Sequence, residues 1–158
     1  MSTIAERLQE LGLELPGPYP PHDPLDAIVV HGGRARTSGQ LPRGHDGQLV
    51  HPGVLGAGLT VADGAEAARW CALNALSVLH AGLGSLDRIT RVLTVLGFVA
   101  SAPGFVEQPA VIDGASHLLY EVFGDSGRHS RSAIGVAALP RGGAVEIEVE
   151  VALAGDGL

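Results

Sequence analysis

The sequence of 158 residues contains no lysine, so all ten of its fixed positive side-chain charges are arginines. The absence of lysine excludes a Schiff-base lysine, and with it ordinary pyridoxal-phosphate chemistry, and it excludes a phosphate-binding loop of the Walker type. A side chain that holds a negatively charged ligand through a permanent charge must therefore be an arginine, whose planar guanidinium suits carboxylates.

Cysteine is nearly absent as well. The single Cys71 allows no internal disulfide and no cysteine-rich zinc site, and its place in an apolar helical run predicts a buried side chain. The histidines of the segment 43–58, His45 and His51, lack a companion pair at metal-ligand spacing, which favours a solvated loop. We therefore expect no metal and no organic cofactor.

Long apolar runs are also missing. The N-terminal segment has no basic head followed by an apolar block, and no stretch reaches the roughly 18 apolar residues that a membrane span needs. A formal charge of −7 with scattered arginines argues against a surface that follows nucleic-acid phosphates. The expectation is a cytoplasmic protein with neither a membrane nor a nucleic acid as partner.

The length suits one domain over residues 1–158, in which residues 1–24 form a short helix, near 3–13, followed by a proline-rich extended arm. The period-two alternation of valine and isoleucine with glutamate in 144–152 is the clearest strand pattern. Hydrophobic periodicity, glycines and prolines predict strands at 27–30, 35–41, 89–102, 132–139 and 144–152, and helices at 61–83 and 108–123. The order β-β-α-β-α-β-β predicts an α+β fold with two main helices on one face of a single sheet.

Two strings fit this order closely: TSGQLP at 37–42 and RSAIGVAALPRGGAVEIEVEV at 131–151. With them, nearly the whole chain resembles the RidA (YjgF) family, and the segments GFVASAPGF and GRHSRSAIGVAALP resemble its branch described as chorismate-mutase-like in fold. The resemblance implies homotrimers with clefts between subunits. For the best-known branch it implies hydrolysis of reactive enamines and imines to ketoacids and ammonia, and some members have been described as ribonucleases or translation inhibitors.

The resemblance also implies roles for individual residues. Arg131 matches the arginine that holds the substrate carboxylate, and Glu146 matches the acid proposed to orient the hydrolytic water. Ser38 and Gly39 match the segment that lines the cleft. The pocket wall departs from the best-known branch at two of its positions, Ala133 and Ser116, where that branch has cysteine and asparagine.

A third departure concerns an aromatic position of the family, which falls at about Leu25, while the available tyrosine, Tyr19, lies six residues earlier. His129 neighbours Arg131 and could titrate near neutrality, although a hydrogen-bonding role is more usual for a histidine at the entry to a strand. His117 and Tyr120 are three residues apart on the second helix, so they could share a face toward a cleft. For Tyr120 we expect ordinary helix packing.

A hairpin of the last two strands would place Arg131 opposite position 152, roughly 20 Å from Glu146 at about 3.3 Å per residue. One small substrate could not touch both in one chain, which predicts that Arg131 of one subunit works with Glu146 of its neighbour. The function expected is hydrolysis of an imine or enamine that carries a carboxylate. The alternative is a trimeric binding or regulatory protein that senses a small carboxylate without turning it over.

Overall fold

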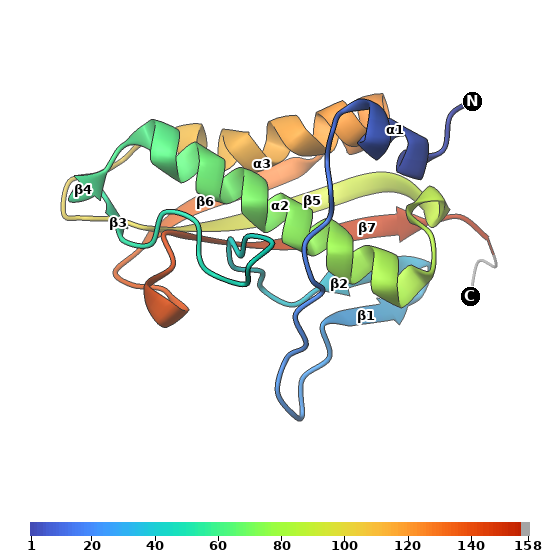
Figure 1. Ribbon diagram of the computed structural model, residues 1–158, viewed down its shortest axis with the longest axis horizontal. Helices are drawn as coiled ribbons and strands as arrows, with labels where there is room; N and C mark the ends of the chain where they lie inside the picture. Colours follow the sequence, from blue (N-terminus) through green and yellow to red (C-terminus); the bar gives the residue numbers. More distant parts are fainter. Residues whose placement is uncertain (156–158) are drawn as a thin grey trace.

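The computed structural model describes residues 1–155, which form a five-stranded sheet covered on one face by helices (Figure 1). The sheet has the strand order β1-β2-β7-β5-β6. The chain runs through α1 (Ile4–Glu10), β1 (Ile28–His31), β2 (Arg34–Thr37), β3 (Val54–Leu55), β4 (Gly58–Leu59), α2 (Val61–Leu83), β5 (Ile89–Ala100), α3 (Gln108–Phe123), β6 (Ser130–Val136) and β7 (Val145–Leu153). The α+β class and the two main helices are as the sequence predicts.

The helix boundaries follow from capping. Thr60 accepts a hydrogen bond from the backbone N–H of Asp63, whose carboxylate accepts one from the N–H of Thr60 in return, and this capping box starts α2. Gly84, in the left-handed conformation, ends it. The α3 helix has a proline in its first turn and ends at Gly124, as expected.

The predicted hairpin of the last two strands is wrong. β5 lies between β6 and β7, parallel to β6 and antiparallel to β7. The segment β5-α3-β6 is a parallel crossover, which needs a helix to carry the chain back to the start of the next strand. The chain then passes the end of β5, where the Ala100 N–H donates to the Ala144 carbonyl at 2.9 Å, and returns along the other edge of β5. The hairpin prediction took β6 and β7 to be hydrogen-bonded to each other because they are consecutive strands in the sequence.

The alternation in β7 separates the two faces of the sheet. Val145, Ile147, Val149 and Val151 are buried beneath the helices, while the intervening glutamates point to the face that the helices leave uncovered. On that face Arg36 pairs with Glu148 at 2.9 Å, and Arg34 with Glu150 at 3.4 Å. Both ion pairs are partly exposed, as the alternation of apolar residues with glutamates in this strand predicts for its solvent-facing side.

The N-terminal arm crosses α2, as Figure 1 shows for the blue segment, and the Ser77 hydroxyl donates to the Pro16 carbonyl there. α1 packs against α3, and the Arg7 Nε donates to the Glu121 carbonyl at 3.0 Å. Within residues 1–155, no helix is both long and apolar enough to cross a membrane.

The two main helices touch at Gly114. They lie side by side over the sheet, and small side chains on α2, including Ala68, Cys71, Ala72 and Ala75, are fully buried in the layer below them. A Cβ added at Gly114 would overlap the backbone carbonyl of Ala65 in α2. This contact fixes the separation of α2 and α3, because neither backbone can move without disturbing the packed layer.

Gly114→Ala should therefore destabilise the fold by about 2 kcal/mol or more, although alanine has the higher helix propensity. Gly82→Ala is the matched control, since the three atoms nearest to its Cβ belong to the Ile28 side chain and none belongs to the backbone. Urea unfolding of both variants measures the difference. A Gly114→Ala protein as stable as the wild type would contradict the close helix contact.

Candidate functional site

Arg131 lies near the start of β6 with its side chain directed toward α3. Its Nη1 donates to the Asp113 carboxylate at 2.8 Å and to the Ser116 hydroxyl at 3.2 Å. Asp113 and Ser116 are three residues apart on one helix face, so both reach the same side chain. The Nε and Nη2 of Arg131 have no hydrogen-bond partner among residues 1–155, and the side chain is 22% exposed. One edge of the guanidinium is therefore free for a ligand.

His129 extends this network. Its Nε2 lies 2.9 Å from the Ser116 Oγ, and its Nδ1 lies 2.6 Å from the Gly127 carbonyl. Because a carbonyl only accepts, Nδ1 must carry the proton, which leaves Nε2 to accept from the serine hydroxyl. Burial lowers the pKa of His129, and the positive charge of Arg131 adds to this effect against the opposing hydrogen bond to Gly127. The ring is therefore neutral at physiological pH.

These residues line an open pocket of about 370 Å³, here called the Arg131 pocket. Its lining consists of Ser116, His117, Tyr120, Gly127, Arg128, His129 and Arg131. Tyr120, expected to pack within the fold, is instead 46% exposed, with the Arg128 guanidinium 5.1 Å from its ring centroid. Ala133 points to the helix-covered face and packs partly buried against the core.

Glu146 belongs to a different cavity, of about 540 Å³, here called the Glu146 pocket. It also contains Ser38 and Gly39, which follow β2. The Gln40 N–H donates to the Ile147 carbonyl, and the Ile147 N–H donates to the Gln40 carbonyl. A Cβ added at Gly39 would lie 2.7 Å from a carboxylate oxygen of Glu146. A larger residue at position 39 would displace the Glu146 carboxylate from this position. Burial, with a smaller contribution from the Glu148 carboxylate, raises the pKa of Glu146.

Both candidates for the aromatic position line the Glu146 pocket. The Tyr19 hydroxyl donates to the Gly44 carbonyl at 2.8 Å, and the Arg43 guanidinium lies 5.2 Å from its ring centroid. Leu25 is 52% exposed beside it. Arg43 and Arg141, which sequence reasoning did not select, add positive charge to this pocket. Nothing in the sequence distinguishes them from surface arginines, because they reach the pocket through irregular loops.

The structure separates Arg131 and Ser116 from Ser38, Gly39 and Glu146, and places Ala133 in the lining of neither pocket. Arg131 is level with Val95 on β5, which is level with Val149 on β7, three residues from Glu146. Three residues along the strand and two strand spacings put their Cα atoms roughly 14 Å apart, less than the roughly 20 Å that the hairpin implied. The side chains diverge further, because Arg131 faces the helix layer and Glu146 faces away from it. One small ligand cannot contact both within one chain.

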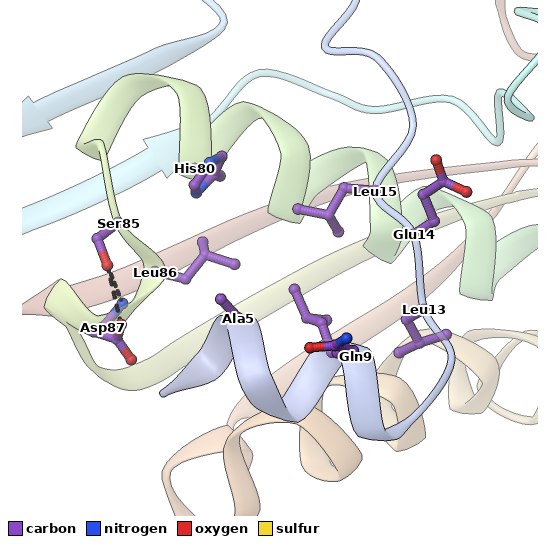
Figure 2. Close-up of a pocket in the computed structure, with 10 residues that line it drawn as sticks. Ala5, Gln9, Leu13, Glu14, Leu15, His80, Ser85, Leu86 and Asp87 are labelled. Carbon is purple, nitrogen blue, oxygen red and sulfur yellow. Dashed lines mark hydrogen bonds between the residues drawn. The ribbon is translucent and has the colours of Figure 1, made fainter. Parts of the chain in front are cut away.

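Other features carry no comparable chemistry. His51 pairs with Glu66 at 2.7 Å, and the ring centroid of His45 lies 5.2 Å from that of Trp70. Within the described residues, no group of three or more His, Cys, Asp or Glu side chains could hold a metal ion. Figure 2 shows a further pocket between α1 and the end of α2, whose lining includes Leu8, Leu13, Leu15 and Leu86. None of the predicted site residues lies there.

The comparisons with known proteins agree with this fold. Residues 5–146 match the family model described as "YjgF/chorismate mutase-like, putative endoribonuclease". The chain is 46% identical over 151 residues to Protein TCP17 of Trypanosoma cruzi, covering 95% of this chain and 94% of that protein.

Two solved structures are also similar. The protein Atu1372 of unknown function from Agrobacterium tumefaciens has 41% sequence identity and a TM-score of 0.88, covering 97% of this chain and 94% of the other. A "putative endoribonuclease" from Shewanella oneidensis has 34% identity and a TM-score of 0.92, covering 96% and 100%. The family match spans most of the chain, and the fold, the helix layer and the C-terminal motif agree with it. The chain belongs to the YjgF/chorismate mutase-like family.

Proposed function

We propose that this protein hydrolyses an imine or enamine that carries a carboxylate, in a cleft formed where two copies of the chain meet. The observation that carries the proposal is the division of the site. The Arg131 pocket offers a carboxylate anchor without an acid free to act on water, because Asp113 is paired with Arg131 itself. The Glu146 pocket offers a half-buried acid. Each group supplies what the other lacks.

Arg131 is suited to anchor a carboxylate. The Asp113 and Ser116 contacts use Nη1 and hold the guanidinium in place, so the Nε and Nη2 edge can form two parallel hydrogen bonds with a ligand. Because the side chain is only 22% exposed, these bonds would form with little competition from water. Because the Asp113 and Ser116 contacts already hold the Arg131 side chain in one conformation, ligand binding costs little further side-chain entropy.

The reaction needs few groups. The enamine first tautomerises to the imine, and then the oxygen of water forms a bond to the imine carbon while the nitrogen takes up a proton. The C–N bond of the resulting aminoalcohol breaks, which releases ammonia and leaves a ketoacid. For the simplest enamine, CH₂=C(NH₂)–COO⁻ and H₂O give CH₃–CO–COO⁻ and NH₃. A carboxylate beside the carbon orients the water and carries the proton.

The uncovered face of the sheet supports association of copies. Leu96 and Phe98 on β5 point to this face, half-buried, and Ile134 on β6 is 45% exposed there. An apolar set of this kind on a sheet face is typical of a surface that another chain covers. We propose a homotrimer, in which cyclic symmetry would repeat each Arg131–Glu146 pairing.

Two other functions are weaker candidates. A binding protein that senses a carboxylate would use the same Arg131 anchor, and Ser116 and Ala133 alter the wall enough to change the preferred ligand. RNA cleavage is disfavoured because a net charge of −7 repels a phosphate backbone. The cytoplasmic location remains a prediction from the sequence.

Subunit complementation tests the shared cleft. Arg131→Ala should lower kcat/KM by about tenfold to hundredfold through loss of charge-assisted hydrogen bonds, and Glu146→Gln by about hundredfold through loss of the proton carrier. Co-refolding equal amounts of the two variants should restore about one quarter of the wild-type activity, because random assembly in a ring pairs an intact arginine with an intact glutamate at one site in four. The activity of each variant and of the mixture is measured as ammonia release from enamines generated in situ.

Glu150→Gln is the matched control, since it lies on the same strand and face, in an ion pair outside the pocket. It should retain wild-type activity. If the mixture is no more active than the two variants on their own, the proposal of a cleft shared between subunits is rejected. Wild-type protein that binds 2-oxobutyrate in calorimetry but releases no ammonia would support the sensor instead.

The activity should depend on the ionisation of Glu146. Its raised pKa means that the carboxyl keeps its proton to a higher pH than the ordinary value of 4.5. Because only the carboxylate accepts a proton from water, kcat/KM should rise with pH through this raised pKa. A pH profile checks this, and the residual activity of Glu146→Gln should lack the rise. If kcat/KM of Glu146→Gln still rises with pH as it does in the wild type, the rise belongs to the ionisation of another group.

A further inference from the structure

Ser116 and His129 form a pair that imine hydrolysis does not require. Ser116 lies in the middle of α3, where a serine hydroxyl often bonds to the carbonyl four residues earlier. Ser77 in α2 is placed this way, with its hydroxyl 3.1 Å from the Leu73 carbonyl while it also contacts the Pro16 carbonyl. The Ser116 hydroxyl instead lies 2.9 Å from the Nε2 of His129, which comes from the segment before β6. The serine is therefore directed into the Arg131 pocket.

The geometry has the three parts of an activated nucleophile. The first is the serine hydroxyl, which donates its proton toward Nε2. The second is a neutral imidazole able to take that proton, and the third is the Gly127 carbonyl, which bonds to Nδ1 at 2.6 Å and fixes the ring tautomer. A nucleophile, a base within hydrogen-bond distance and a group that orients the base are the arrangement of covalent nucleophilic catalysis, of which acyl transfer is one class.

Arg131 strengthens the pair in two ways. Its Nη1 donates to the Ser116 Oγ at 3.2 Å, so a positive charge is already directed at the oxygen that becomes negative when the proton leaves. Its free Nε and Nη2 edge remains available for an acidic group elsewhere on the ligand. The lowered pKa of His129 keeps the base unprotonated.

We propose that Ser116 is a nucleophile activated by His129, and that the Arg131 pocket transfers acyl groups from esters or thioesters that carry a carboxylate. The Ser116 Oγ forms a bond to the acyl carbon while its proton passes to His129 Nε2. The bond from the acyl carbon to the leaving oxygen or sulfur breaks, and the leaving group takes the proton from His129. Water then releases the acid from Ser116 by the same steps in reverse. This activity needs one chain and does not involve Glu146.

Two probes test the pair on the 158-residue chain. A fluorophosphonate reacts by attack of the serine oxygen on phosphorus with loss of fluoride, and intact-mass and peptide analysis should locate the adduct on Ser116. Mono-4-nitrophenyl glutarate, which carries a free carboxylate, should give a burst of nitrophenolate, and 4-nitrophenyl butyrate a slower one. Ser116→Ala should abolish both the adduct and the burst. His129→Gln should slow them by about hundredfold or more, because the general base is lost.

Controls separate nucleophilic from structural roles. Ser132→Ala removes a serine from the other face of β6 and should react like wild type. Arg131→Ala should lose the preference for the glutarate ester over the butyrate ester. Melting temperatures of all variants establish that they are folded. A wild-type protein without an adduct on Ser116, or a folded His129→Gln protein labelled at the wild-type rate, would overturn the proposal. Either result leaves the ammonia-release test of imine hydrolysis unaffected.

Discussion

The hydrogen bonding of β5 to both β6 and β7 is the constraint on which the rest of the structure depends. It places the strand with Arg131 and the strand with Glu146 on opposite sides of a shared neighbour. The parallel β5–β6 pairing requires α3 as a crossover, and α3 supplies Asp113 and Ser116 beside Arg131. The antiparallel β5–β7 pairing directs the glutamates of β7 to the uncovered face. One strand arrangement therefore creates both pockets and keeps them apart.

Most of the fold could be predicted from the sequence, because its signals are local. The helices predicted at 61–83 and 108–123 and the alternation in 144–152 all appear in the structure at or near the expected positions. The wrong prediction concerned which strands are hydrogen-bonded to each other in the sheet. A turn rich in proline and glycine between two strands suggests a hairpin, and only the three-dimensional course of the chain shows that Pro140–Gly142 carries it past the end of β5.

The candidate site was predicted in part. The family resemblance selected Arg131, Glu146, Ser38, Gly39, Ser116 and Ala133. The structure places the first five in two pockets, whereas Ala133 packs against the core. The conclusion that one ligand cannot contact both Arg131 and Glu146 within one chain stands, but its reason is new: the side chains face opposite sides of the sheet. The hydrogen-bond partners of Arg131 could not be predicted, because Asp113 and Ser116 meet it only when α3 is docked on β6.

The contact of Gly114 with the Ala65 carbonyl has a consequence for ligand affinity. Gly114 lies between Asp113 and Ser116, so the backbone that positions both side chains is clamped against a second helix. A backbone held in this way loses little conformational entropy when a ligand binds. The contacts with the ligand then contribute to affinity without first having to order the protein. The walls of the Arg131 pocket, by contrast, come from side chains such as His117 and Tyr120 that point into the open. In the site that we propose, ligand preference could therefore change through these side chains while the backbone that positions Arg131 stays rigid.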